Sequence, residues 1–308
     1  MSLFKGKRNN KETLSTTFDV TIATIKRNLI TDWQYKSDIV IQLLWTITNL
    51  VAYGALGLSV GQGGGEFAPN YSFSLFLLAS SAYWTMFTGN YEETAFCLRE
   101  EAARGTMGYL ITNNVDTYGI MVGRYFSSSL KYLAIFLVTT IPMFAFIKGD
   151  NGNLLPHTAL EFFMLIPLIL FAYCFMMCIS LFIGSITLLV KQTTTIVKIV
   201  LYLVRIIGGY FFMIEFFSDF GWWWPVLSVC IPIVTGQYAF RKYLIEHDAY
   251  ARFPDVSYFA DQTDFAGLTY WQVVLINLAV CAVFVLASFY FVKWITKIAR
   301  KRGTIEFY

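Results

Sequence analysis

Long apolar runs alternate with short polar segments along the chain, and each run has the length of a membrane-spanning helix. A helix needs about 20 apolar residues to cross the hydrocarbon core of a bilayer. On this criterion the pattern predicts six spans, at residues 39–60, 72–90, 125–147, 162–190, 196–214 and 271–295. With 56% hydrophobic residues, the composition is also far more apolar than that of a soluble domain. We therefore expect an all-α integral membrane protein whose 308 residues form a single transmembrane domain.

One further apolar block is too short and too interrupted to cross a bilayer. It covers Phe216–Ile233 and is broken by Gly221, Pro225 and Pro232. Irregular backbone at membrane depth is tolerated only where protein or water satisfies its polar groups. We therefore expect residues 215–270 to form a re-entrant or interfacial helical segment on the outer side, followed by a loop that precedes the last span.

The residues before the first span have the pattern of an amphipathic helix. Apolar side chains recur every three or four residues, which places them on one helical face. They are Leu14, Phe18, Ile22, Ile25 and Leu29, whereas Thr17, Thr21, Thr24 and Asn28 lie off this stripe. A helix of this kind lies in the membrane interface rather than across the bilayer. Residues 12–36 are therefore predicted to form a surface helix in contact with membrane lipid.

The distribution of Lys and Arg predicts the orientation. Basic residues gather before the first span, after the last span and in the segment between the second and third spans. Few lie on the opposite side, namely Lys148, Arg241, Lys242 and Arg252. Because loops rich in Lys and Arg stay in the cytoplasm, both termini are expected inside the cell, with the chain in the cell (inner) membrane. The net charge of +3 reflects this bias and gives no reason to expect nucleic acid as a partner.

Residues 91–124 form a polar segment in a chain that is only 14% charged. A membrane protein with so many charges in one internal loop is expected to present that loop to a partner in water, although a solvated loop without a partner is the alternative. Gly105 and Thr106 permit a sharp turn between two helical arms. The flanking charges can pair across a wet interface and set its register. These charges belong to Arg99, Glu100, Glu101 and Arg104.

Arg205 lies deep in the fifth predicted span, with Lys198 seven residues earlier on nearly the same face. Charges in lipid are costly and often mark functional sites. One interpretation is that both residues, with Asn49 of the first span, face a translocation path or dimer interface suited to an anionic or amphiphilic substrate. The other is that Arg205 is structural and is capped by carbonyls or by Asn49 or Gln42. Two further charges sit near span ends and are expected to extend towards the interface, namely Lys131 and Glu161.

Residues for chemistry within this chain are scarce. The five cysteines have no metal-binding or redox spacing, and the chain has two histidines, so no metal site is expected. The glycine-rich stretch 61–65 lacks the Gly-Lys-Ser/Thr ending of a phosphate-binding loop. No Ser-His-Asp, Cys-His or carboxylate-rich group suggests catalysis. We therefore expect no catalytic residue, no ATPase motif and no cofactor in this chain.

The segment Leu98–Tyr125 resembles the cytoplasmic signature of permeases of ABC transporters of the type-2 exporter class. In that signature a charged run leads into Gly-Thr-Leu-Glu, a short apolar stretch and a Gly-Lys or Gly-Arg pair. The matching residues are Glu100, Arg104, Gly105, Thr106, Leu110, Gly123 and Arg124. The departures are Met107 for Leu, Gly108 for Glu and Asn114 for a common Pro. The segment Trp224–Arg241 resembles the family's outer segment before the last span, through Pro225, Pro232, Thr235 and Arg241.

The resemblance covers nearly the whole chain and implies a transmembrane permease domain over residues 1–308. It implies a dimer with a second permease chain, identical or not, on two cytoplasmic ABC ATPase subunits that bind ATP and Mg. Residues 91–124 would then be the coupling region that docks on the ATPase, and the complex would export an amphiphilic drug, peptide, lipid or glycan. Two other classes stay open, a membrane-embedded lipid- or glycan-modifying enzyme and a secondary transporter. A sensor or scaffold built on such a permease is a further alternative.

Overall fold

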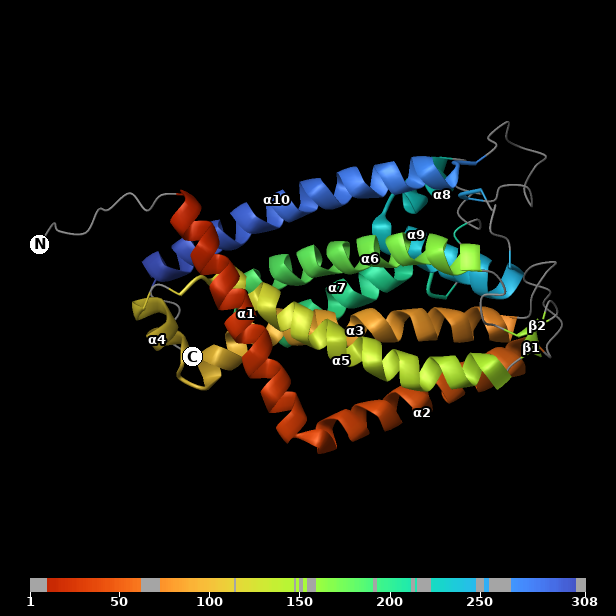
Figure 1. Cartoon of the computed structure of the whole chain (residues 1–308), viewed down its shortest axis with the longest axis horizontal. Coiled ribbons are helices and arrows are strands. Elements are labelled where there is room, and N and C mark those ends of the chain that lie inside the picture. The colour runs from red at the N-terminus through yellow and green to blue at the C-terminus, as the bar shows by residue number, and fades with distance from the viewer. Residues whose placement is uncertain are drawn as a thin grey trace, which may run out of the picture.

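The computed structural model describes residues 10–61, 73–113, 115–146, 148–149, 152–153, 159–190, 193–211, 214, 223–247, 252–254 and 267–302. Within these ranges the chain is almost entirely helical (Figure 1). The glycine-rich stretch after Gly61 and the acidic loop at 255–266 lie outside them. The described strands are the two-residue β1 (Lys148–Gly149) and β2 (Gly152–Asn153), which pair antiparallel.

Five long helices run along the long axis of the molecule (Figure 1). They are α2 (Lys36–Gly61), α3 (Phe73–Ala103), α5 (Thr117–Phe146), α6 (Ala159–Ile186) and α10 (Tyr270–Arg302). The shorter elements are α4 (Met107–Thr112), α7 (Thr193–Ile207), α8 (Trp223–Val229), α9 (Pro232–Arg241) and the π-helical turn η2 (Lys242–Glu246). The helix α4 lies at the same end of the bundle as the last turns of α10, whereas β1, β2 and α8 lie at the other end.

Among the described residues, four helices are long and apolar enough to cross a membrane. They are Lys36–Leu56, Thr117–Ala145, Ala159–Ile186 and Tyr270–Lys301. The chain is therefore a multi-pass helical membrane protein. These helices correspond to the predicted spans 39–60, 125–147, 162–190 and 271–295.

The predicted spans 72–90 and 196–214 do not meet the same criterion. The first lies in α3, which is long enough but less apolar, because it occupies the middle of the bundle and packs against α2, α5 and α6. A helix shielded by its neighbours can carry polar residues such as the fully buried Ser80 and Asn90. The second lies in α7, whose 15 residues are shorter than the roughly 20 that span a bilayer.

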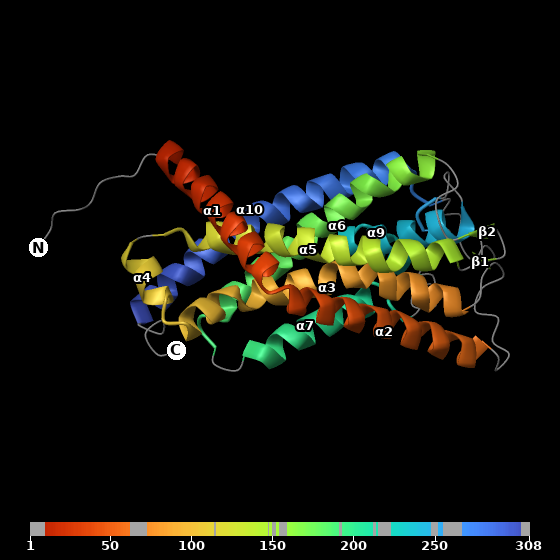
Figure 2. The ribbon, with the colours of Figure 1, turned by 60° about the horizontal axis from the view of Figure 1, so that its bottom comes forward.

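The N-terminal helix α1 (Asn10–Gln34) crosses the bundle obliquely in both views of the ribbon (Figures 1 and 2). It packs on α5 where two glycines, four residues apart, let the backbones approach. A Cβ at Gly119 would lie 2.9 Å from the carbonyl oxygen of Thr17, and one at Gly123 would lie 2.7 Å from that of Thr21. The threonine side of α1 is therefore the side that faces the protein.

The apolar stripe of α1 remains uncovered. Phe18 and Ile22 are 65% and 49% exposed, and Leu29 is also exposed. The side chain of Leu14 is outside the described part of the chain. An exposed apolar face opposite a docked polar face has the polarity expected of a helix that rests in a membrane interface. The structure thus has a helix over Asn10–Gln34 with Phe18, Ile22 and Leu29 exposed and Ile25 half-buried, and its place at a membrane surface stays a prediction.

Two sequence-based expectations are wrong. Lys131 and Glu161 do not extend towards an interface, because both side chains are buried. The Lys131 ammonium pairs with Glu93 and lies 3.9 Å from Asp32, whereas Glu161 lies 3.6 Å from His247. Charged groups inside a protein are stabilised by a partner of opposite sign or a hydrogen-bonding group, and here such partners were available on neighbouring elements.

Candidate functional site

The polar segment 91–124 is more helical than the loop expected from sequence. The helix α3 continues to Ala103, well past the predicted end of its span, and α5 begins at Thr117. The charged residues Arg99, Glu100 and Glu101 therefore lie on the last turns of α3. The short helix α4 occupies the space between these two helix ends and forms the tip of the bundle (Figure 1).

The predicted sharp turn lies at Gly105, whose φ is +73°. Two backbone hydrogen bonds close it, from Gly105 N to Ala102 O and from Thr106 N to Glu101 O, both at 3.0 Å. This pattern is the Schellman ending of a helix, and glycine is preferred there because it adopts a positive φ without a steric penalty. The turn therefore fixes the direction in which α4 leaves α3.

Glu101 holds the turn from the inside of the protein. Its side chain is 6% exposed, and its two carboxylate oxygens have different partners. One accepts a bond of 2.6 Å from Arg27 of α1, and the other accepts a bond of 2.5 Å from the hydroxyl of Thr106. Burial raises the pKa of Glu101, but the hydrogen bond from Thr106 and the charge of Arg27 outweigh it, so the pKa lies below its usual value. The carboxylate is therefore ionised and acts as a brace between α1, α3 and the turn.

A second charged cluster joins α1, α3 and α5 just behind this brace. Arg124 lies 3.2 Å from Glu93 and 4.0 Å from Glu100, and Lys131 bonds the other oxygen of Glu93. Asp32 of α1 lies near Lys131, and burial, partly offset by Lys131, raises its pKa. The cluster fixes where α5 begins relative to α3, which the sequence alone gave no means to predict.

The predicted coupling residues thus divide into two groups. Glu101 and Thr106 bond within the protein and shape the turn. The outward group includes Arg104 and Glu100, which form a weak pair of 3.8 Å with side chains 65% and 42% exposed. Arg99 donates a bond of 3.0 Å to Thr194 at the start of α7. On α4, Met107 is buried in the core while Tyr109 is 74% exposed.

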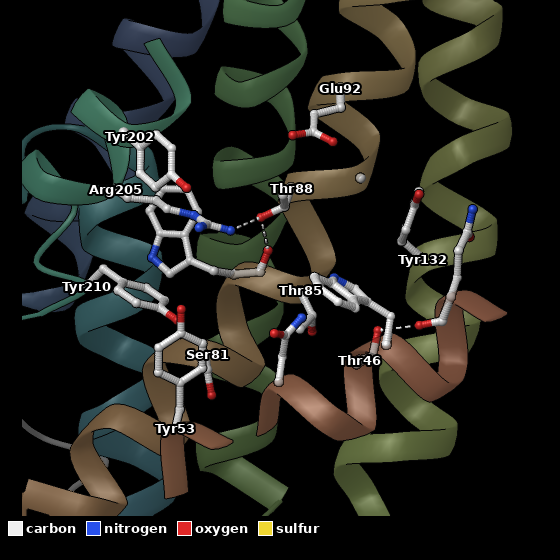
Figure 3. A pocket seen from close by; sticks show the side chains of 15 residues that line it. Thr46, Tyr53, Ser81, Thr85, Thr88, Glu92, Tyr132, Tyr202, Arg205 and Tyr210 are labelled. Atoms are coloured by element: carbon white, nitrogen blue, oxygen red, sulfur yellow. Dashed lines mark hydrogen bonds between the residues drawn. The ribbon is translucent and has the colours of Figure 1, made fainter. Parts of the chain in front are cut away.

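A cavity of about 300 Å³ lies between α2, α3, α5 and α7, within the part of the bundle formed by the predicted spans (Figure 3). Fifteen residues line it, and Arg205 and Asn49 are among them. The structure therefore brings together these two of the three residues assigned to a translocation path. Lys198, the third, is exposed and does not line the cavity.

Arg205 stands in the last turn of α7 and points into this cavity (Figure 3). The helix ends just after it, because Gly209 adopts a φ of +70°. The guanidinium donates a bond of 2.7 Å to Thr88 and lies over the rings of Tyr210, Trp84 and Tyr202, at 5.4, 5.8 and 5.9 Å from their centroids. Its Nε atom is buried without a hydrogen-bond partner. In the described part of the chain no carboxylate lies within ion-pairing distance of it.

Sequence reasoning missed most of the cavity. Trp84, Thr88 and Tyr53 line it but occupy ordinary positions in apolar helices. Gln42 was considered as a cap for Arg205, yet its Oε1 atom is buried without a partner. Glu92 lies at the end of the cavity away from Tyr53 and Ser81. Burial raises the pKa of Glu92, and the positive charges of Arg205 and Lys198 offset part of this rise. The spacing of polar residues along α2 and α3 was the sequence feature from which this cavity could have been predicted.

The outer segment before the last helix packs into the bundle. Every residue of α9 from Pro232 to Arg241 is buried, and α9 contacts α6 and α3. The hydroxyl of Thr235 bonds the carbonyl oxygen of Val229, while Arg241 bonds Ser80 and the carbonyl oxygen of Gly209. Pro232 opens α9, and Pro225 lies in α8. Arg241, which was counted among the outer charges, is thus a structural residue of the core.

A scan of the chain against protein-family models finds no match, and no similar curated protein is found. The class that the fold defines is a multi-pass helical membrane protein with a polar cavity among its helices. A finer assignment rests on the geometry of the cavity and of the turn at Gly105.

Proposed function

We propose that the chain is the transmembrane subunit of an ATP-driven ABC exporter whose ATPase subunits are separate polypeptides. One observation carries the proposal. The helix α4 projects at the tip of the bundle on a turn fixed by Gly105, with Tyr109 exposed on it and the exposed charges of Glu100 and Arg104 directly before the turn. A rigidly oriented, exposed helix is what a docking motor needs if its motion is to move the membrane helices.

The braces behind α4 support this role. A push on α4 would reach α3 through the turn, α1 through the ion pair of Glu101 with Arg27, and α5 through the pair of Arg124 with Glu93. The helices α3 and α5 also border the cavity. Contacts of this kind form a short physical route between the docking surface and the cavity.

In this proposal α3 and the segment 196–214, of which α7 is the helical part, complete six spans. Both termini and α4 face the cytoplasm of the cell (inner) membrane, and the cavity belongs to the translocation path. A second permease chain would face the open side of the cavity. Two ATPase subunits would bind ATP and Mg, and residues Arg99, Glu100 and Arg104 would contribute to the surface that meets them. The substrate would be an amphiphilic molecule that enters the path near Arg205.

Purification tests the proposal. The tagged chain, extracted from its own host in mild detergent, should bring an ATPase subunit in equal amount, and the complex should hydrolyse ATP. The chain purified alone should not. Arg205→Ala should leave this complex assembled and lower transport or substrate-stimulated hydrolysis. ATP hydrolysis by the isolated chain, or a pure chain from native membranes without an ATPase, would refute the proposal.

A further inference from the structure

The lining of the cavity near Arg205 has an unusual chemistry for a site between membrane helices. Six of its fifteen residues are aromatic, four are serine or threonine, two carry amides, two are charged and one is glycine. None has an aliphatic side chain. Ligand pockets are usually lined predominantly by apolar side chains with a few polar groups. This cavity instead offers aromatic faces and a high density of hydrogen-bonding groups.

Such a lining disfavours an acyl chain or another aliphatic ligand. The hydroxyls of Ser81, Thr85 and Thr46 donate to carbonyl oxygens of their own helices and keep their acceptor sites free. An aliphatic group would remove water from these acceptor sites and from the amides of Gln42 and Asn49, and would leave the buried Oε1 atom of Gln42 without a hydrogen-bond partner. Leaving buried polar groups unpaired is costly. A ligand that covers itself with hydroxyl groups would satisfy them.

Aromatic rings and hydroxyl partners together fit a sugar ring. The C–H groups on one side of a pyranose form a flat apolar face, and their slight positive charge suits the negative face of an aromatic ring. The edge of the same ring carries hydroxyls that donate and accept hydrogen bonds. Trp45, Tyr53 and Tyr132 provide rings besides the three that contact Arg205, and the volume of about 300 Å³ suits one or two sugar rings rather than a large drug.

The charged residues of the cavity indicate whether the bound sugar is neutral, acidic or basic. Arg205 has a free Nε donor and, in the part of the chain that the structure describes, no carboxylate within ion-pairing distance. Three aromatic faces are already occupied by its guanidinium. A ligand cation at these rings would be repelled by the positive charge of Arg205. Glu92 lies at the end of the cavity away from Tyr53 and Ser81 and would repel a second anion while accepting bonds from hydroxyls.

We propose that this cavity binds a glycosyl unit bearing a single anionic group, a carboxylate or a phosphate, with that group on Arg205 and the sugar ring against the aromatic side chains. This assignment rests on the proposed function only in treating the cavity as part of a substrate path. It narrows the open list of drug, peptide, lipid and glycan to an acidic glycan unit.

Direct binding to the full chain in phosphatidylcholine nanodiscs tests the assignment. Four probes separate the possibilities when titrated by saturation-transfer NMR: cellobiose, cellobiouronic acid, cellobiose 1-phosphate and octyl phosphate. At least one of the acidic disaccharides should bind about tenfold or more tightly than both cellobiose and octyl phosphate, because an ionic partner strengthens a hydrogen bond. Which acid binds better identifies the carboxylate or the phosphate as the group recognised.

Variants locate the site. Arg205→Gln should abolish the preference for acidic over neutral disaccharide, and Arg205→Lys should retain part of it. Trp45→Leu, on an exposed side chain whose loss leaves the core intact, should weaken all the sugars. Trp294→Leu, an exposed tryptophan outside the cavity, is the matched control and should change nothing.

Three results would overturn the assignment. They are binding of octyl phosphate as tight as that of the acidic disaccharides, an acidic preference that survives Arg205→Gln, and no saturable binding of any sugar. None of these measurements needs an ATPase. An absent ATPase partner would therefore refute the proposed function while leaving a sugar site intact, and absent sugar binding in a working complex would refute the ligand alone.

Discussion

Arg27 of α1 and Glu101 of α3 form an ion pair of 2.6 Å across 74 positions of the sequence. The carboxylate also accepts a hydrogen bond from Thr106, just beyond the turn at Gly105. The exposed fractions of the two side chains differ, 52% for Arg27 and 6% for Glu101. The pair therefore joins a surface helix to a buried group that shapes the candidate docking helix α4.

Removing Arg27 should destabilise the protein more than removing an exposed cation. Arg27→Gln leaves a buried carboxylate with one partner fewer, which costs about 1–3 kcal/mol. Adding Glu101→Gln to this variant should recover part of the loss, because the buried charge disappears. Thermal unfolding in detergent measures both. Arg104→Gln is the matched control, since an exposed pair contributes about 0–1 kcal/mol; equal effects of Arg27→Gln and Arg104→Gln would contradict the brace.

The same brace should depend on pH in a defined direction. The folded-state pKa of Glu101 lies below the ordinary value of 4.5, so its contribution is complete above that pH and is lost as the pH falls through the folded-state pKa. Spin labels at Asp19 and Tyr109, replaced by cysteine, should report a constant α1–α4 distance from pH 8 to 5 and a broadened one in stronger acid. Broadening that begins near neutral pH would show that another group controls the contact.

The contact between α1 and α5 should not tolerate a side chain at Gly119 or Gly123. Gly123→Val places atoms within 2.7 Å of the backbone of Thr21, so α1 must shift, and such overpacking costs about 1–3 kcal/mol. The variant should melt earlier and expose α1 to protease. Gly108→Ala on α4 is the control, because nothing lies within 4 Å of a Cβ there. Unchanged melting of Gly123→Val would mean that α1 does not pack as described.

Labelling in intact cells tests the orientation. An impermeant thiol reagent should not reach Tyr109→Cys or Gly303→Cys and should label Asp255→Cys, because positive charge gathers at the termini and at residues 91–124. The five native cysteines are buried or half-buried, so the parent protein provides the blank. Labelling of Tyr109→Cys from outside would reverse the orientation and place α4 away from any cytoplasmic motor.

Each of the six predicted spans contains a helix, and four of these helices, among the described residues, are long and apolar enough to cross a membrane. The runs that became α2, α5, α6 and α10 are long and apolar enough to span, as four predicted spans required. The helix α3 is less apolar because neighbours cover it, and α7 stops at Gly209 although its run continues. Burial inside a bundle depends on tertiary partners, which a single sequence does not reveal.

The candidate site shows the same division. Gly105 and Thr106 identified the turn because a positive φ has a local preference for glycine. Arg205 could be selected because a deep charge is rare in a span. The partners of these residues could not be found in advance, since Glu101 meets Arg27 and Arg205 meets Thr88 only after distant helices pack.

The central claim is that α4 and the turn before it dock on a separate ATPase, and ATPase capture by two variants tests it most directly. Gly105→Pro cannot keep a φ of +73°, and Glu100→Arg reverses an exposed charge where a complementary surface is proposed. Asp255→Ala, in the loop that the charge distribution predicts on the outer side, is the control.

All three variants should reach the membrane at normal levels, because insertion depends on the apolar spans. Gly105→Pro and Glu100→Arg should then lose the bound ATPase or hydrolyse ATP without transport, while Asp255→Ala retains both. If Gly105→Pro and Glu100→Arg both bind the ATPase and transport at the level of the parent protein, residues 91–124 are not the coupling region.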